Sequence, residues 1–144
     1  MINGEKWLDN MEQCSLEVIP CLNYDHSTRY VLTIPPSPNL PNMRSIYLYP
    51  SLCFFEGTNV SIGRGTDFPF QVFGAPYFNK DQFSFTPKAT YGAKNPKHKL
   101  TKCYGKDLRI LSMDSLKNIN KLNLNWLVNS YKWSNESEFF FNKN

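Results

Sequence analysis

The sequence lacks several features that would place it in a well-defined class. No apolar run approaches the roughly 20 residues of a membrane-spanning helix, and the opening MINGEKWLDN has neither the basic nor the apolar region of a secretory signal. The four cysteines form no C-x-x-C pair, and only two histidines accompany them. These absences predict no membrane span, no export signal in the chain as written, and no metal site.

The composition that is present predicts one globular, loop-rich domain. A chain of 144 residues is of ordinary single-domain size, and its hydrophobic and charged fractions of 41% and 19% are globular. An aromatic content of 15% and ten prolines favour irregular structure over a helical bundle. Cys53 and Cys103 lie in apolar or strand-like runs, so we expect them to be buried and unpaired. Cys14 and Cys21 can either pair in an exported protein or stay free.

A basic cluster accounts for much of the net charge of +4. In KNPKHKLTK, Lys94, Lys97, Lys99 and Lys102 surround His98. Such a cluster suits either a phosphate or nucleic-acid patch or a solvated lysine loop. No arginine joins it and no aromatics interleave with it, so the solvated loop is favoured and no nucleic-acid partner is predicted.

Turn residues and periodicity predict extended structure and one broken helix in the first half of the chain. SLEVIPCL predicts a strand over residues 16–22. The four prolines of IPPSPNLPN exclude a helix there. A helix then begins at Pro41 or Asn42, runs through MRSIYLYPSLCFF, and is divided by Pro50.

The second half predicts short strands followed by one helix. FQVFGAPYF, FSFTPKAT and KCYGKDLRIL read as strands or extended pieces, with turns at Gly74, Pro76 and Pro87. Asp114 or Ser115 can cap a helix over about residues 115–132. Its i, i+3, i+4, i+7 spacing predicts a buried face formed by Leu124, Leu127, Val128 and Tyr131.

The stretch FFEGTNVSIGRGTDFPF, residues 54–70, predicts a chain folded closely around a ligand, because its glycines tolerate positive φ and close approach. A phosphate is a poor match. No G-K-[ST] follows, and Phe68 stands where a dinucleotide fingerprint needs its third glycine.

A sugar fits this stretch better. Arg64 can bind an anionic substituent, Phe70 or Phe73 can face the ring, and Glu56 can act as an acid, base or nucleophile in glycoside hydrolysis. Hydroxyl groups of the ring would meet Thr58, Asn59, Ser61 and Thr66. The alternative is that Glu56 and Arg64 pair as a structural clamp.

The segment PPSPNLPNMRSIYLYPSLCFFEGTNVSIGRGTDFPFQVFGAP, residues 35–76, resembles the signature region of the NamZ (YbbC-like) family of exo-β-N-acetylmuramidases. PSPNLP, YPSLCFFEGTN, GRGTDFPF and FGAP stand in the family's order and spacing, and the resemblance continues through FSFTPKATYGAKNPKHKLTKCYG to Gly105. It implies a peptidoglycan-directed hydrolase that removes terminal N-acetylmuramic acid without a metal or an organic cofactor.

The resemblance also implies an architecture. We expect an α/β fold of the α+β type, with residues 1–144 forming a single, partial C-terminal domain and the loop 54–76 carrying the signature. The family's N-terminal Rossmann-like domain is absent here and could lie on another chain. That domain is expected to supply an essential acid, so the 144 residues alone are expected to be inactive. The resemblance also suggests an exported, bacterial protein of the cell envelope that acts in cell-wall recycling.

The resemblance assigns roles residue by residue. Glu56 is the catalytic candidate, and Arg64 is the expected partner of the lactyl carboxylate of N-acetylmuramic acid. Further substrate-binding candidates are Asn39, Thr58, Asn59, Ser61, Thr66 and His26, the last together with Tyr24. An alternative is a non-catalytic muropeptide-binding module or the remnant of a split gene.

Overall fold

The computed structural model describes residues 2–9, 12–119, 121–134 and 139–142. The chain divides into two units, Met1–Tyr30 and Val31–Asn144. In the first unit the strand expected over residues 16–22 is wrong, because this segment is extended without a pairing partner. Its apolar side chains are exposed, Ile19 at 87% and Leu22 at 89%. The single-domain extent of residues 1–144 stays a prediction.

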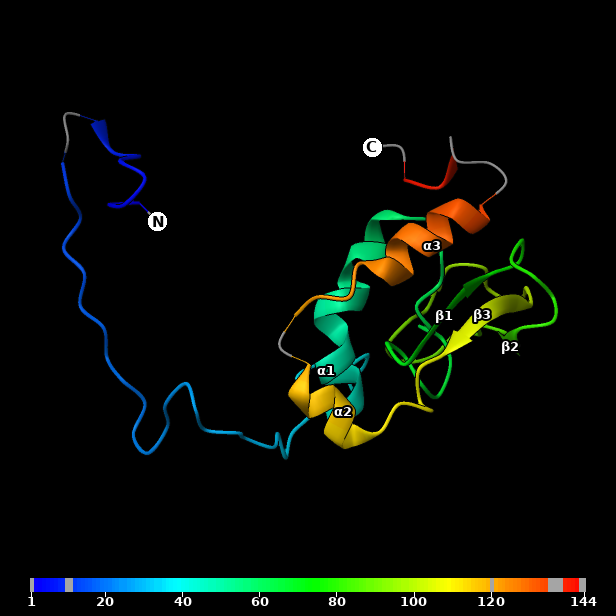
Figure 1. The fold of residues 1–144 in the computed structure, drawn as a ribbon, viewed down its shortest axis with the longest axis horizontal. Helices are drawn as coiled ribbons and strands as arrows, with labels where there is room; N and C mark the ends of the chain where they lie inside the picture. Colours follow the sequence, from blue (N-terminus) through cyan, green and yellow to red (C-terminus); the bar gives the residue numbers. More distant parts are fainter. Residues whose placement is uncertain (1, 10–11, 120, 135–138, 143–144) are drawn as a thin grey trace. The chain divides into compact units, whose positions relative to one another are not determined.

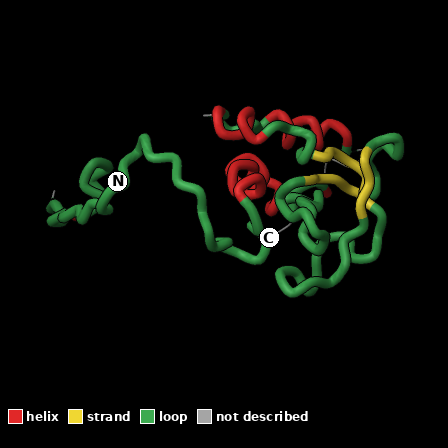
Figure 2. The backbone as a smooth tube through the Cα atoms, turned by 90° about the horizontal axis from the view of Figure 1, so that it is seen from below, coloured by secondary structure: helices red, strands yellow, loops and turns green. Residues whose placement is uncertain are grey.

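The second unit combines helices with a small antiparallel sheet, which confirms the predicted α+β class (Figure 1). The strands β1 (Val72–Ala75), β2 (Phe83–Phe85) and β3 (Cys103–Asp107) are ordered β1-β3-β2. The helices lie together beside the sheet (Figure 2). Within the residues that the structure describes, every helix is too short or too polar to cross a membrane.

The helix α1 (Met43–Leu52) leads directly to the catalytic candidate. Asn42 caps it, as predicted, by accepting a hydrogen bond from the Ser45 backbone N–H at 3.0 Å. Pro50 does not divide the helix but lies in its last turn, and the chain then tightens into the 3₁₀ helix η2 (Cys53–Gly57). Glu56 is therefore held at the end of a continuous helical segment.

Two glycines allow β1 and β3 to approach closely. Gly74 is paired with Gly105 across the sheet, so the predicted turn at Gly74 is wrong. A Cβ atom on Gly105 would lie 2.0 Å from the carbonyl oxygen of Phe73, a distance that no side chain permits. Ser61 extends this region by exchanging two backbone hydrogen bonds of 2.9 Å with Gly74.

The sheet separates two apolar clusters. On one face, Phe73 and Ala75 join the main core with α1 and η2; on the other, Val72 packs with Phe85 and Cys103. This alternation follows from the two-residue period of a strand. The main core contains Leu48, Leu52, Phe55, Val60, Ile62, Phe70, Phe73, Ala75, Phe78, Leu108, Leu116 and Phe140.

The predicted C-terminal helix is two helices, α2 (Met113–Asn118) and α3 (Asn125–Trp133). Ser112 caps α2 in place of the predicted Asp114 or Ser115. The predicted apolar face of α3 is also largely wrong. Leu124, Val128 and Tyr131 are more than 40% exposed, whereas the side chains packed on the core are Trp126, Leu127 and Trp133.

The cysteines follow the prediction in part. Cys103 is buried and free, as expected, and burial raises the pKa of its thiol to about 12. Cys53 is free but only half-buried, because it lies at the start of η2 rather than inside the core. Cys14 and Cys21 are exposed and free.

Candidate functional site

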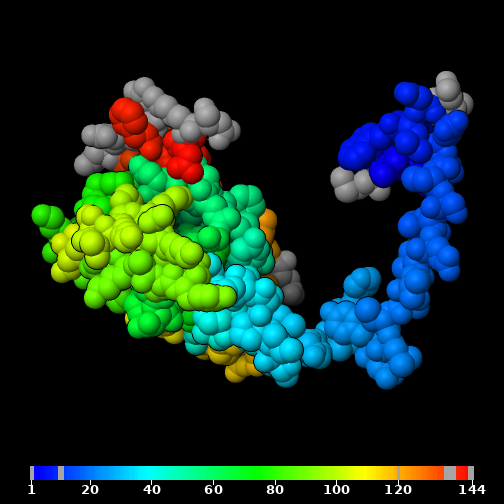
Figure 3. Space-filling view, turned by 180° about the vertical axis from the view of Figure 1, so that it is seen from behind, coloured from blue at the N-terminus to red at the C-terminus, as the bar shows by residue number. Residues whose placement is uncertain are grey.

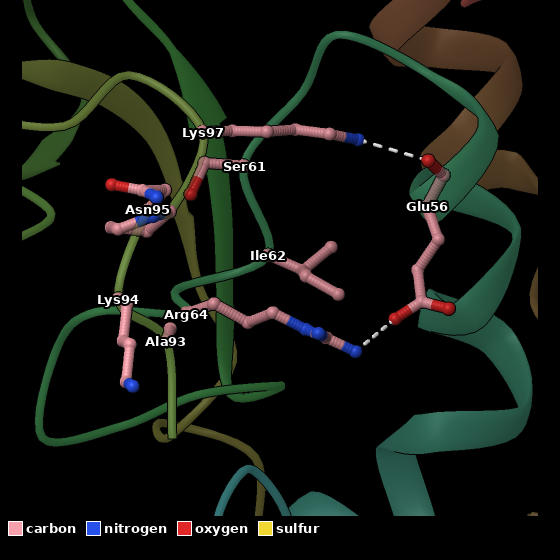
Figure 4. A pocket seen from close by; sticks show the side chains of 9 residues that line it. Glu56, Ser61, Ile62, Arg64, Ala93, Lys94, Asn95 and Lys97 are labelled. Carbon is pink, nitrogen blue, oxygen red and sulfur yellow. Dashed lines mark hydrogen bonds and ion pairs between the residues drawn. The ribbon is translucent and has the colours of Figure 1, made fainter. Parts of the chain in front are cut away.

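A pocket of about 420 Å³ lies between the glycine-rich segment and the lysine-rich loop of the second unit, within the size range of small-molecule sites (Figure 4). Its lining consists of Glu56, Ser61, Ile62, Arg64, Ala93, Lys94, Asn95, Pro96 and Lys97. In the space-filling view, the green residues that follow α1 adjoin the yellow-green residues of this loop (Figure 3). Two segments about forty residues apart in the sequence thus form one surface.

Of the glycines expected to bring the chain close to a ligand, Gly65 brings the two walls of the pocket together. Gly63 and Gly65 both have positive φ, 78° and 82°. A Cβ atom on Gly65 would lie 2.4 Å from the carbonyl oxygen of Lys88 and 2.6 Å from the ring of Pro96. The absence of that atom lets the loop containing Pro96 pack directly on the segment that presents Arg64.

The charged side chains of Glu56 and Arg64 form an ion pair across the pocket (Figure 4). Both side chains are about 40% exposed, and the guanidinium also lies 5.4 Å from the ring centroid of Phe70. Exposed ion pairs usually stabilise a protein by less than about 1 kcal/mol. The ion pair predicted as a structural clamp is present. A pair this exposed contributes little to the stability of the protein, so stability alone does not explain its position in a pocket.

Lys97 fixes the backbone around Glu56. Its ammonium group donates hydrogen bonds to the carbonyl oxygens of Phe55 at 3.2 Å, Glu56 at 3.0 Å, and Thr58. These carbonyls are at the C-terminal end of η2, where helical acceptors lack partners within the helix and a positive charge is favourable. Burial lowers the pKa of Lys97 below its ordinary 10.5, while the charge of Glu56 acts in the opposite direction.

His98 supports the same region from the next position in the chain. Its Nε2 lies 2.6 Å from the carbonyl oxygen of Asn59, so this nitrogen carries the proton and donates it when the ring is neutral. Burial lowers the pKa of His98 below its ordinary 6.5. The neutral ring therefore holds the segment after η2 at neutral pH.

The predicted site residues divide into two groups. Glu56, Ser61 and Arg64 meet in the pocket. Thr58 is buried, and its hydroxyl donates to the carbonyl of Phe55 at 2.8 Å. Asn59 donates to the carbonyl of Phe139 at 2.8 Å and accepts from the hydroxyl of Tyr77. Burial raises the pKa of this tyrosine to about 12.

Three further candidates also lie outside the pocket lining. The hydroxyl of Thr66 donates to the carbonyl of Gly63 at 2.6 Å, and the amide of Asn39 donates to the carbonyl of Gly92 at 2.8 Å. Both bonds hold loops in place. His26, with Tyr24, belongs to the first unit and is exposed there.

The aromatic residues expected beside a sugar are not available to it. Phe70 and Phe73 are at most 1% exposed, as is Phe55, because all three are part of the main core. Phe54, the neighbour of Phe55 in the sequence, does reach the surface, at 45% exposed. The apolar part of the pocket comes instead from Ile62, Ala93 and Pro96.

The pocket residues that the sequence did not identify are Lys94, Asn95 and Lys97. The basic cluster itself was visible, but a solvated loop was the favoured interpretation. Lys97 is half-buried and bonded to three carbonyls, so that interpretation is wrong for this residue. The available signal was the position of the cluster inside the segment that resembles the NamZ family.

The arrangement offers one carboxylate, three cationic groups and two polar side chains around an open volume. Among the residues that line the pocket, all of them described, Glu56 is the sole acid. No group of three or more His, Cys, Asp or Glu residues able to hold a metal occurs in the described part of the chain. Chemically, the pocket can bind a polar ligand with an anionic substituent and supply one carboxyl group.

The comparison with known families supplies the identification. The profile of the family described as exo-β-N-acetylmuramidase NamZ, C-terminal, matches residues 47–144. The chain belongs to this family. Peptidoglycan β-N-acetylmuramidase NamZ of Bacillus subtilis (strain 168) is 37% identical over 90 residues, which are 55% of this chain and 22% of that protein.

A solved structure confirms the fold of the chain. A crystal structure of a DUF1343 family protein from Bacteroides fragilis NCTC 9343 matches 97% of this chain with a TM-score of 0.83 and 49% sequence identity. The match covers 39% of the Bacteroides protein. The present chain therefore spans less than half the length of both relatives.

Proposed function

We propose that this chain forms part of a peptidoglycan-directed glycosidase that releases terminal N-acetylmuramic acid. The observation that carries the proposal is the pocket in which Glu56, Arg64 and Ser61 meet two further lysines. Membership of the NamZ family and the name of the Bacillus subtilis relative support the same reaction. The sugar is the partner, and no cofactor is needed.

Glu56 has the central chemical role in this proposal. As an ion-paired carboxylate it accepts hydrogen bonds, so it suits a base, a nucleophile or a group that stabilises the positive charge of the transition state. Arg64 orients it, and Lys97 fixes the backbone that carries it. Glycoside hydrolysis normally uses a second carboxyl group. We assign that group to the Rossmann-like domain that the family resemblance implies, on the same or another chain.

A non-catalytic sugar-binding module is the second candidate, and one observation favours it. Glu56 is the sole acid among the residues that line the pocket. With one carboxyl group, the pocket can bind a muramic-acid fragment without cleaving it. The two candidates differ in whether a second acid completes the site.

A chimaera tests the catalytic proposal. This chain replaces the matching region of the Bacillus subtilis relative, and release of N-acetylmuramic acid from a disaccharide is measured. Glu56→Gln should lower kcat by about 100- to 10,000-fold with a much smaller rise in KM, because an acid–base or nucleophilic group acts mainly in the transition state. Asp81→Asn, an exposed carboxylate outside the pocket, is the matched control.

Two results would count against the proposal. A folded, active chimaera in which Glu56→Gln retains full kcat would remove Glu56 from the chemistry. Hydrolysis by the 144-residue chain alone would show that no outside acid is needed, since the proposal expects no turnover without it. Melting temperatures of the Glu56→Gln and Asp81→Asn chimaeras equal to that of the unsubstituted chimaera verify that folded proteins are compared.

A further inference from the structure

We infer that Lys94 is the residue that selects the substrate by binding its carboxylate. The inference rests on the proposed function and identifies a specificity-determining side chain in the same pocket. The family resemblance assigned the carboxylate to Arg64, but the ion pair with Glu56 already offsets the charge of Arg64.

Two of the three cations in the pocket are engaged. Arg64 donates to the carboxylate of Glu56, so the charges of this pair offset each other. The ammonium group of Lys97 has three N–H donors, and three carbonyl oxygens accept from it. A substrate carboxylate that bound to Lys97 would have to displace an existing partner. Arg64 gives one Nη2 donor to Glu56 while its Nε has no partner, so it is the charge of Arg64, and not all of its donors, that is engaged.

Lys94 is an exposed cation whose charge is not offset by a partner. Among the charged residues of the pocket lining, all of them described, it is the one whose side chain has no ion-pair or hydrogen-bond partner; its backbone carbonyl accepts from Lys99 at 3.2 Å. Formal charges of Glu56, Arg64, Lys94 and Lys97 leave the lining positive, which favours an anionic ligand.

The loop that carries Lys94 is well fixed. Thr90 and Ala93 exchange backbone hydrogen bonds of 2.9 and 3.2 Å, and Pro96 packs against Gly65 on the opposite wall. In the close view, Lys94 and Glu56 lie at opposite sides of the pocket (Figure 4). A ring bound between them can place its glycosidic oxygen near Glu56 and an acidic substituent near Lys94.

Two sugars that differ in the acidic substituent test the inference directly. N-acetylmuramic acid carries a lactyl carboxylate that N-acetylglucosamine lacks. Binding of each sugar to the 144-residue chain is measured by NMR titration at low salt. Wild type should prefer N-acetylmuramic acid by about tenfold or more, the worth of one charge-assisted hydrogen bond. In Lys94→Gln the two affinities should become nearly equal, and Lys94→Arg should restore the preference.

Two matched controls separate the inference from a general charge effect. Lys80→Gln removes the same charge at an exposed position outside the pocket and should leave the preference unchanged. The double variant Glu56→Gln/Arg64→Gln removes the ion pair without changing the net charge. It should weaken both sugars by a similar factor and so keep their ratio.

The outcomes are distinguishable. If Lys94→Gln keeps the wild-type preference for N-acetylmuramic acid, Lys94 does not bind the carboxylate. The same conclusion follows if the double variant abolishes the preference. In both cases the sugar site itself stands. Wild-type protein that binds both sugars equally overturns the inference and leaves a sugar site. Wild-type protein that binds neither sugar overturns the sugar site as well. Loss of the preference in Lys94→Gln alone supports the inference.

Discussion

Gly105 is the residue at which backbone geometry restricts the sequence most severely. A Cβ atom there would lie 2.0 Å from the carbonyl oxygen of Phe73, and the strands β1 and β3 cannot separate without disturbing the core on both faces. Gly105→Ala should therefore lower the free energy of unfolding by about 3 kcal/mol or more, measured by urea titration.

Gly57 offers a control for this prediction. A Cβ atom there would meet nothing within 4 Å, and its φ is not positive. Gly57→Ala should change the free energy of unfolding by less than about 1 kcal/mol. Equal effects of the two substitutions would show that the close approach of the strands does not restrict residue 105.

His98 gives the protein a defined pH dependence. Because burial lowers its pKa, the unfolded chain takes up a proton near pH 6.5 and the folded chain does so only at lower pH. The contribution of neutral His98 to the free energy of unfolding is thus fully present above about pH 6.5, and it is lost as the pH falls toward the lowered pKa. Melting temperatures between pH 7.5 and 5 should show this loss, and His98→Gln should reduce it. His26→Gln should keep the wild-type profile; a flat wild-type profile would refute the assignment.

Among the helices, α3 packs on the main core through the face that carries Trp126. Trp126 lies 6.2 Å from Phe73, centroid to centroid, and belongs to the half-buried residues around the main core. Trp126→Ala should cost about 3 kcal/mol of unfolding free energy. Val128 is 46% exposed, and Val128→Ala should cost less than about 1 kcal/mol. Chemical denaturation of both variants measures the two losses of unfolding free energy. A larger loss in Val128→Ala than in Trp126→Ala would support the buried face predicted from the spacing.

The elements that the sequence predicted well have local causes. Asn42 starts α1 because its side chain caps a free N–H, and the strands near Phe73, Phe85 and Cys103 follow runs of aromatic and small apolar residues. The failures have nonlocal causes. The segment 16–22 finds no pairing partner, and the spacing over residues 124–131 fits a helix but does not say which side meets the core.

The candidate site was predictable on one wall only. The composition of the glycine-rich segment and its resemblance to the NamZ family identified Glu56, Ser61 and Arg64. The second wall, formed by residues 93–97, depends on the contact of Pro96 with Gly65 and of Lys97 with the end of η2. No local pattern encodes these contacts, so a lysine that binds carbonyls could not be distinguished from one in solvent.

In the molecule as a whole, we propose that one pocket of the second unit binds one class of ligand, a sugar with an acidic substituent. The relatives are much longer than this chain, which covers 22% and 39% of them, so the pocket represents one part of a larger enzyme site in our proposal. Its sugar-binding part can still be tested in isolation, because both walls come from the second unit.

The most direct test is to map the binding of N-acetylmuramic acid to the 144-residue chain by backbone amide NMR. Saturable shifts should gather at Ser61, Ile62, Arg64, Lys94 and Asn95, the residues around the open volume. Shifts centred instead on the separate surface around Phe83 and Arg109, or no saturable shift at millimolar sugar, would contradict the account.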